Sequence, residues 1–283
     1  MKVFIVGLGL IGGRYAYGLS QKGYEVYGCD KNIDAINYAK ENKFIIDGCQ
    51  NAGDMIADMD VVILSIYPQA ILSFLEENNK YFNSKQIITD VCGVKLSYVA
   101  EATKLAAPAV YCAHHPMAGR EKIGIEYAKD VIFEGANFLV TPTDATPADV
   151  VELIKKMGND LGFARITVMS PDYHDKMIGF TSQLTHAIAV SLVNSDHDDN
   201  TKNYIGDSYR DLTRIAMINE DLWSELFLEN KDFLIKHIIS FEYELAVLKK
   251  SLIDNNKDSL KALFKSSTKI RKEMEKWEGL ILI

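Results

Sequence analysis

The fold is decided by the stretch Val6-Gly7-Leu8-Gly9-Leu10-Ile11-Gly12-Gly13, which has the spacing G-x-G-x-x-G. An apolar run leads into it and a helical pattern leads out, so the stretch predicts strand, tight turn and helix. Gly7 permits the turn, Gly9 lets the backbone approach a pyrophosphate, and Gly12 lets the helix pack closely on the strand. The free N–H groups at the helix start, around Leu10 and Ile11, would then face the phosphates.

A second predicted strand, residues 25–29, ends at Asp30, which lies 18 residues past Gly12. This is near the expected position of the acid that binds a ribose 2′-hydroxyl, and its charge would repel a 2′-phosphate. We therefore expect NAD rather than NADP as the cofactor, although Lys31 beside it would soften the repulsion. Ser65, near the end of strand 61–66, is a further predicted cofactor contact. The competing interpretation, a Gly-rich turn without a ligand, is disfavoured by the completeness of the fingerprint.

Composition narrows the class of protein. The chain has 283 residues, 48% of them hydrophobic, and a formal net charge of −8, which argues against a nucleic-acid partner. Its four cysteines show no C-x-x-C spacing and lie in or beside apolar runs, as expected for reduced thiols in a cytoplasmic protein. No apolar run approaches 18 residues, and no signal peptide precedes the first strand, so we expect neither a membrane span nor export.

The first half alternates strands and helices. This pattern predicts an α/β fold with a Rossmann-type, doubly wound parallel sheet, whose ligands bind beyond the carboxyl ends of the strands. His114 and His115 would follow one such strand end and face the crevice. Besides the elements above, the expected strands are 44–46, 86–90, 109–112, 137–140 and 165–169, and the expected helices are 33–42, 69–78, 97–105 and 147–161.

After Ser170-Pro171 the pattern is helical almost to the end, with Ser170 as a plausible N-cap. We therefore predict two domains, an NAD-binding domain over 1–169 and an all-α domain over 170–283. An apolar stripe from Leu222 to Leu245 offers more surface than a small helical domain covers alone, which predicts a homodimer built through this half. The expected helices are 170–193, 207–218, 220–253 and 257–277.

The histidines of the chain could serve as metal ligands or as bases. His197 lies in the acidic stretch Asp196–Asn200, but no second cluster completes a metal site, so we expect a solvated loop and no metal. His237, inside a long helix, reads as structural. His115 is different because a histidine at a strand end in the crevice serves as a general base near neutral pH. From position alone, a capping or packing role for it is equally plausible.

Several further motifs follow in order along the chain: His115-Pro116-Met117-Ala118-Gly119, Glu121-Lys122, Leu139-Val140-Thr141-Pro142-Thr143, Met169-Ser170-Pro171-Asp172-Tyr173-His174-Asp175, Ser182-Gln183-Leu184-Thr185-His186-Ala187, Arg210-Asp211-Leu212-Thr213-Arg214-Ile215-Ala216 and Trp223. Together these motifs resemble the prephenate dehydrogenase family. The resemblance implies an NAD-dependent enzyme of tyrosine biosynthesis, with a Rossmann domain followed by a helical domain that dimerises.

By this resemblance His115 matches the catalytic histidine, which contacts the ring hydroxyl of prephenate. Arg214 matches the substrate-carboxylate arginine, His186 a histidine lining the pocket, and Glu121 an acid at the pocket mouth. Arg210 stands where the family often has another cation, and Lys95 is a weaker source of charge. One departure matters: a serine that often partners the catalytic histidine in this family falls at Gly93.

The resemblance implies oxidative decarboxylation of prephenate to 4-hydroxyphenylpyruvate. The sequence leaves two alternatives open. One is an arogenate dehydrogenase, which uses the amino-acid analogue of the same substrate. The other is a non-catalytic dinucleotide-binding regulator, which the presence of both His115 and Arg214 disfavours.

Overall fold

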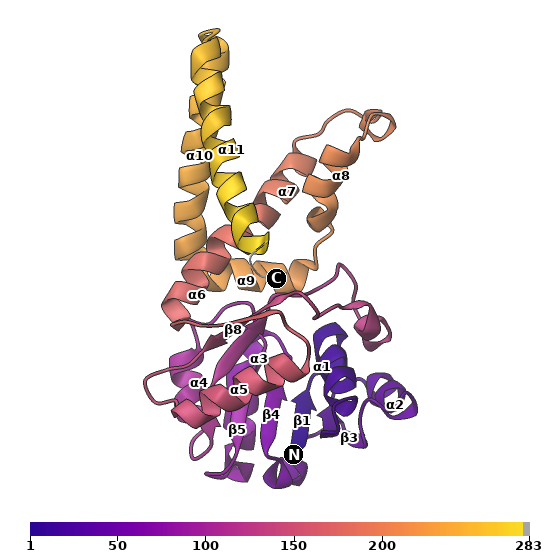
Figure 1. Ribbon diagram of the computed structural model, residues 1–283. Coiled ribbons are helices and arrows are strands. Elements are labelled where there is room, and N and C mark those ends of the chain that lie inside the picture. Colours follow the sequence, from indigo (N-terminus) through magenta and orange to yellow (C-terminus); the bar gives the residue numbers. More distant parts are fainter. Residues whose placement is uncertain (280–283) are drawn as a thin grey trace. The chain divides into compact units, whose positions relative to one another are not determined.

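A computed structural model describes residues 1–279 of the chain, and its N-terminal part is built on a parallel sheet (Figure 1). The strand order is β3-β2-β1-β4-β5-β6, so the chain starts in the middle and winds outward in both directions. The strands are β1 (Lys2–Val6), β2 (Glu25–Cys29), β3 (Asp47–Cys49), β4 (Val61–Leu64), β5 (Ile87–Asp90) and β6 (Val110–Tyr111).

Alternate residues of β1 enter two different cores, one on each face of the sheet. Val3 and Ile5 belong to the core formed with α1, α2 and α5, whereas Phe4 and Val6 belong to the core formed with α3 and α4. All four are buried, which explains the unbroken apolar run. The predicted doubly wound α/β fold is therefore confirmed. The helices are α1 (Leu10–Ser20), α2 (Ile33–Glu41), α3 (Pro68–Asn78), α4 (Val99–Leu105) and α5 (Ala148–Asp160).

The prediction that all strands join one parallel sheet was wrong. A second sheet has the order β7-β8-β9, with β7 antiparallel to β8; its strands are β7 (Ala113–Pro116), β8 (Asn137–Thr141) and β9 (Arg165–Val168). His115 therefore lies inside β7, paired with Leu139, rather than after a strand end. Strand direction depends on pairing between distant segments, and a run of apolar residues does not report it.

The strand expected at 44–46 was also wrong. Phe44 and Ile45 are buried in the core, but they lie in the loop after Lys43, whose φ of 59° is left-handed. Strand pairing starts only at Asp47. Short 3₁₀ helices fill other connections: η1 (Gly53–Asp58), η2 (Asn79–Tyr81), η3 (Ile125–Asp130), η5 (Thr201–Asn203) and η6 (Arg214–Ala216).

The C-terminal half is helical as predicted, but three expected helices are interrupted, and the one expected over 207–218 ends at Thr213 and is followed by η6. The helix expected over 170–193 contains a π-helical turn, η4 (Gly179–Gln183), and the helix expected over 220–253 breaks at Asn230. Ser170 is an N-cap, since its Oγ accepts from the Tyr173 N–H. The helices are α6 (Pro171–Ile178), α7 (Leu184–Asn194), α8 (Asp207–Thr213), α9 (Glu220–Glu229), α10 (Lys231–Ile253) and α11 (Lys257–Gly279).

Contacts divide the chain into one compact unit, Met1–Lys231, and a second that starts at Asp232. Within the first unit, α6 and α9 lie beyond the carboxyl ends of the strands (Figure 1). Leu226 of α9 is buried in the core of α3 and α4, and Glu225 accepts a hydrogen bond from the Gln69 N–H at the start of α3. The predicted domain boundary at residue 169 stays a prediction.

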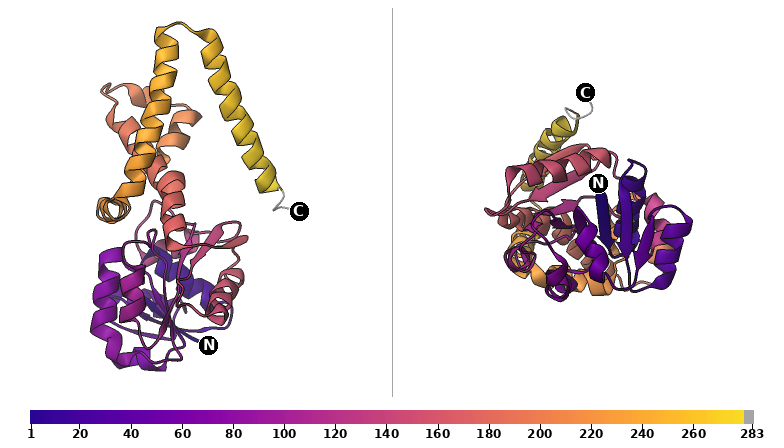
Figure 2. Two further views of the ribbon diagram at one scale, coloured as in Figure 1. Left: turned by 90° about the vertical axis from the view of Figure 1, so that its left-hand side faces the viewer. Right: turned by 90° about the horizontal axis from the view of Figure 1, so that it is seen from below.

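The second unit is a helical hairpin of α10 and α11, joined by a turn in which Asn255 adopts a left-handed φ of 47° (Figure 2). Ser251 and Ser259 pair their hydroxyls across the turn at 2.7 Å. In the part of the chain that the structure describes, we find no helix long and apolar enough to span a membrane.

Candidate functional site

The Gly-rich turn leaves the N-terminus of α1 open. Gly7 has a left-handed φ of 89°, and a Cβ there would lie 2.3 Å from the Ser65 carbonyl oxygen. A Cβ on Gly12 would lie 1.8 Å from the Gly7 oxygen, so both positions require glycine. At Gly9, by contrast, nothing lies within 4 Å of that position, and no side chain caps the helix. Leu10 and Ile11 form its first turn, whose N–H groups suit an anion.

Asp30 is fixed beside this turn. Its Oδ2 accepts from the Leu8 N–H at 2.6 Å and its Oδ1 from the Asn32 N–H at 2.8 Å. The carboxylate thus lies at the end of β2, and its oxygens can accept further hydrogen bonds from the two hydroxyls of a ribose. Together with the open helix start, these residues fit a dinucleotide.

His115 is half-buried, and its imidazole has one hydrogen-bond partner among the described side chains. Its Nδ1 lies 2.9 Å from Nε2 of His174, whose Nδ1 lies 2.7 Å from Oδ1 of Asp175. Both partners belong to α6 and are fully buried. Burial, together with the neighbouring His174 and Lys95, holds the pKa of His115 well below its usual value. His115 is therefore uncharged at neutral pH.

His114, its neighbour, has a structural role. It is buried, with Nε2 at 2.8 Å from the Tyr15 hydroxyl and Nδ1 at 2.6 Å from the Thr89 hydroxyl. Its ring stacks on Phe138 at 4.7 Å. Burial lowers its pKa to about 3, so it stays neutral. Adjacent strand residues point to opposite faces, which explains why only one of the two histidines is accessible.

Gly93 lies against His115. A Cβ at this position would be 3.8 Å from Cε1 of His115 and 3.6 Å from the Leu226 side chain. The departure from the family pattern therefore falls directly beside the imidazole. Residues 90–95 are held by buried ionic contacts: the Lys95 ammonium lies 2.5 Å from Asp90 and is completely buried. Lys95 is thus committed to Asp90 and is not free to bind a substrate.

The predicted substrate residues partly converge. Arg214 of η6 forms an ion pair with Glu121, and both influence the charge state of His186 on α7. His186 stacks on Trp223 of α9 with centroids 3.7 Å apart, and burial lowers its pKa. Arg214 is 59% exposed, so it remains able to exchange Glu121 for another carboxylate.

Arg210 does not join this group. Its guanidinium bonds to Asp207 at 2.6 Å and to the Ile205 carbonyl, both near the start of its own helix, and it is exposed. The proposal that it contributes charge to a substrate remains a prediction.

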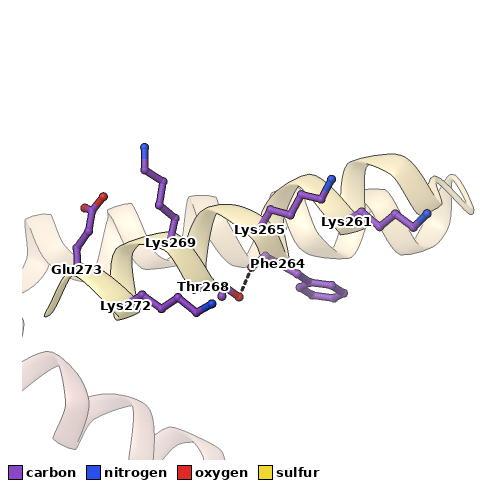
Figure 3. A pocket seen from close by; sticks show the side chains of 7 residues that line it. All are labelled: Lys261, Phe264, Lys265, Thr268, Lys269, Lys272 and Glu273. Carbon is purple, nitrogen blue, oxygen red and sulfur yellow. Dashed lines mark hydrogen bonds between the residues drawn. The ribbon is translucent and has the colours of Figure 1, made fainter. Parts of the chain in front are cut away.

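Two hollows lie on the surface. One, of about 500 Å³, is lined by Arg120, Glu121, Lys122, Asp130 and Met217, so it adjoins the Glu121–Arg214 pair. The other lies on α11, where Lys261, Lys265 and Lys269 recur one turn apart beside Phe264 (Figure 3). It contains no predicted site residue and is open. Among the described residues, no group of histidine, cysteine and carboxylate side chains has the arrangement of a metal site.

His174 and Asp175 were not among the predicted site residues, although the structure links them to His115 by hydrogen bonds. The sequence places them in one of the quoted motifs, and an adjacent His-Asp pair near the start of a helix is a usable signal. Its target, His115, lies 59 residues earlier in the chain, and only the fold brings the two histidines together.

The open Gly-rich turn, the fixed acid after β2 and the following helical region define a Rossmann-type nucleotide-binding protein. The chain belongs to the prephenate dehydrogenase family. Residues 15–168 match the family model for the prephenate dehydrogenase nucleotide-binding domain, and residues 170–266 match the model for its dimerization domain. It is therefore an oxidoreductase of that family, as the motifs led us to expect.

Named relatives agree. The chain is 27% identical to the prephenate dehydrogenase of Bacillus subtilis, over 95% of this chain and 75% of the relative. It is also 27% identical to the cyclohexadienyl dehydrogenase of Zymomonas mobilis, over 95% and 94%. A crystal structure of prephenate dehydrogenase from A. aeolicus with hydroxyphenyl propionate and NAD⁺ superposes with a TM-score of 0.88 at 30% identity, covering 97% and 98% of the chains. The Synechocystis arogenate dehydrogenase shares the fold, with a TM-score of 0.83, 24% identity and 97% and 100% coverage.

Proposed function

We propose that this protein catalyses the NAD-dependent oxidative decarboxylation of prephenate to 4-hydroxyphenylpyruvate in tyrosine biosynthesis, as a cytoplasmic homodimer. Matches to both family models support the reaction class and the dimer. The observation that carries the proposal is His115, an uncharged and half-buried imidazole in β7, beside the glycine where the family has a serine.

The cofactor residues are those of the Gly-rich turn and its partner acid. Gly7, Gly9 and Gly12 admit the pyrophosphate, the N–H groups of Leu10 and Ile11 bind it, and Ser65 lies against the turn. Asp30 accepts from the ribose hydroxyls. NAD, when bound, supplies the hydride acceptor. The crystallised relative with NAD⁺ supports this choice.

His115 serves as the general base. Prephenate carries a 4-hydroxyl on a cyclohexadiene ring, and oxidation of this alcohol to a ketone requires loss of the hydroxyl proton as the hydride leaves the same carbon for NAD. A neutral imidazole accepts that proton, and general-base catalysis of this kind contributes about 10²–10⁴ in rate. Loss of the ring carboxylate then yields the aromatic product and makes the reaction irreversible.

The substrate carboxylates need cations. Arg214 is suited to this because its planar fork binds a carboxylate with two hydrogen bonds. Glu121 forms an ion pair with this arginine in the structure. His186, stacked on Trp223, lines the pocket, and Arg210 is a more distant source of positive charge.

An NADH-formation assay that compares prephenate with arogenate, and NAD with NADP, tests the proposal. We expect the highest kcat/KM with prephenate and NAD. A preference for arogenate would reassign the substrate within the same family. Equal or better efficiency with NADP would contradict the role of Asp30. No turnover of either substrate would support the non-catalytic alternative.

A further inference from the structure

The two buried residues behind His115 form an ordered chain of hydrogen bonds. Asp175 accepts backbone N–H groups from Lys95 at 2.9 Å and from Leu96 at 2.7 Å. A buried carboxylate that receives such bonds is ionised, and an ionised carboxylate only accepts. The 2.7 Å contact from His174 Nδ1 to Asp175 is therefore an N–H donated by His174.

This fixes the protonation of His174. Because burial lowers its pKa, His174 carries one ring proton at neutral pH, and that proton is on Nδ1. Its Nε2 is therefore a bare acceptor. The 2.9 Å contact from His115 Nδ1 to His174 Nε2 then requires the proton on His115 Nδ1. In neutral His115, Nε2 is left with a free lone pair.

The opposite side of His115 offers no substitute for this bond. Gly93 has no side chain, and a Cβ there would touch Cε1 of His115 and the apolar Leu226. The charged and titratable groups around the ring, Lys95, His114 and Asp90, are engaged with one another or with buried hydroxyls. The contact with His174 is therefore what orients the imidazole.

We propose that His174, held by Asp175, is the positioning residue that fixes His115 in its Nδ1–H tautomer and so aims Nε2 at the substrate hydroxyl. The inference rests on the proposed role of His115 as the base. When Nε2 takes the proton, the Nδ1–H of His115 continues to donate to His174. The Asp175 carboxylate, on the far side of His174, then stabilises the positive charge of the His115 imidazolium. A hydroxyl at residue 93 is unnecessary in this arrangement.

The test compares two replacements of His174. Phenylalanine keeps the ring volume but cannot accept the Nδ1–H, whereas the side-chain oxygen of glutamine can. We expect His174→Phe to lower kcat by about 10²–10⁴, the range for a base held in the wrong tautomer, and His174→Gln to stay within about tenfold of wild type. Tyr173→Phe, an exposed neighbour on the same helix, is the matched control and should keep full activity. The KM for NAD should change in none of them.

A readout independent of turnover is the ¹⁵N NMR spectrum of the His115 imidazole. At pH 7.5 the wild type should show a protonated Nδ1 and a bare Nε2, and His174→Phe should show mixed or inverted tautomers. A protonated Nε2 in neutral wild-type His115 would overturn the proposal, as would equal kcat for the phenylalanine and glutamine variants. If the wild-type tautomer is as expected but neither prephenate nor arogenate is turned over, the proposed function fails while the assignment stands. If His174→Phe does not fold, the wild-type spectrum and His174→Gln decide.

Discussion

At the scale of single residues, the two neighbouring histidines of β7 have different surroundings. His114 is buried between Tyr15, Thr89 and Phe138, whereas His115 is partly exposed and, among the described residues, has its hydrogen bond at Nδ1. The two arginines of the α8 region also differ. Arg214 pairs with Glu121 of a distant segment, whereas Arg210 bonds to Asp207 of its own helix and to the nearby Ile205 carbonyl.

His115→Asn should lower kcat by at least about 10²-fold while leaving NAD affinity nearly unchanged, because asparagine keeps polarity but cannot take the proton. Steady-state kinetics and NADH titration measure the two effects. His186→Asn is the comparison, since His186 on α7 is the other histidine predicted to lie near the substrate. Near-normal kcat in His115→Asn, with activity abolished in His186→Asn, would move the base to His186.

The pH dependence follows from the lowered pKa of His115. The ordinary pKa of histidine is 6.5, and a lowered pKa keeps the imidazole neutral below that pH. His115 therefore remains able to accept a proton until the pH falls through its lowered pKa. We therefore expect the acid limb of kcat to lie below pH 6.5. Thermal melts at each pH separate this from unfolding, because buried neutral histidines also cost stability in acid. An acid limb at or above pH 6.5 would contradict the burial of this site.

Arg214→Ala should mainly raise the KM for prephenate. A hydrogen bond between charged groups at a partly exposed site is worth about 1.5–3 kcal/mol, which corresponds to roughly 10- to 150-fold in KM. Arg210→Ala is the matched control, and we expect a smaller effect because its guanidinium is bonded within its own helix. Unchanged prephenate binding in Arg214→Ala would make this arginine structural.

At the scale of elements, polar side chains at the helix breaks form hydrogen bonds that connect the helices from α6 to α9. Asn230 ends α9, is buried, and its amide donates to the Asp175 carbonyl at 2.9 Å and to Gln183 Oε1 at 2.7 Å. Gln183 lies at the end of the π-helical turn and itself donates to the Leu226 carbonyl. One side chain therefore links α6, the π turn and α9.

Asn230→Ala should destabilise the protein by about 1–3 kcal/mol, because Gln183 Oε1 and a buried carbonyl lose their donor. Differential scanning calorimetry should show a Tm lowered by a few degrees. Asn203→Ala, at an exposed position, should leave the Tm unchanged. An unaltered Tm in Asn230→Ala would show that the break between α9 and α10 does not depend on this amide.

At the scale of the whole molecule, the predicted apolar stripe from Leu222 to Leu245 has a part that packs in the core and a part that is exposed. Leu222 and Leu226 pack with the core of α3 and α4, whereas Phe241 and Leu245 on α10 are exposed in the single chain. Ile235 and Ile239 of the same helix are more than half exposed. Such a surface is typical of an obligate interface between copies.

We expect a homodimer in sedimentation experiments at micromolar concentration. Leu245→Glu should weaken the dimer at least tenfold, about 1.4 kcal/mol, because a carboxylate would be buried without a partner. Lys249→Glu, an exposed polar residue one turn further along α10, controls for the change in charge. A monomeric wild type, or equal effects of the two substitutions, would contradict a dimer built through this surface.

The sequence by itself determined the doubly wound sheet, the Gly-rich turn, the acid at Asp30 and the family. These depend on local constraints: the left-handed φ of Gly7, a Cβ on Gly12 that would collide with the Gly7 oxygen, an unbroken apolar run along β1, and an N-cap at Ser170. Such constraints act within a few residues, so a linear pattern records them.

Only the tertiary structure decided the second sheet, the division of roles between His114 and His115, and the link from Asp175 through His174 to His115. The end of α9 at Asn230 also depends on tertiary structure, because the apolar periodicity of this stretch predicts one continuous helix. Each of these depends on a partner far away in the chain: Leu139 for His115, Tyr15 and Thr89 for His114, Gln183 for Asn230. Helical and strand periodicities report which face of an element is apolar, but hydrogen bonds between distant segments decide which element that face meets.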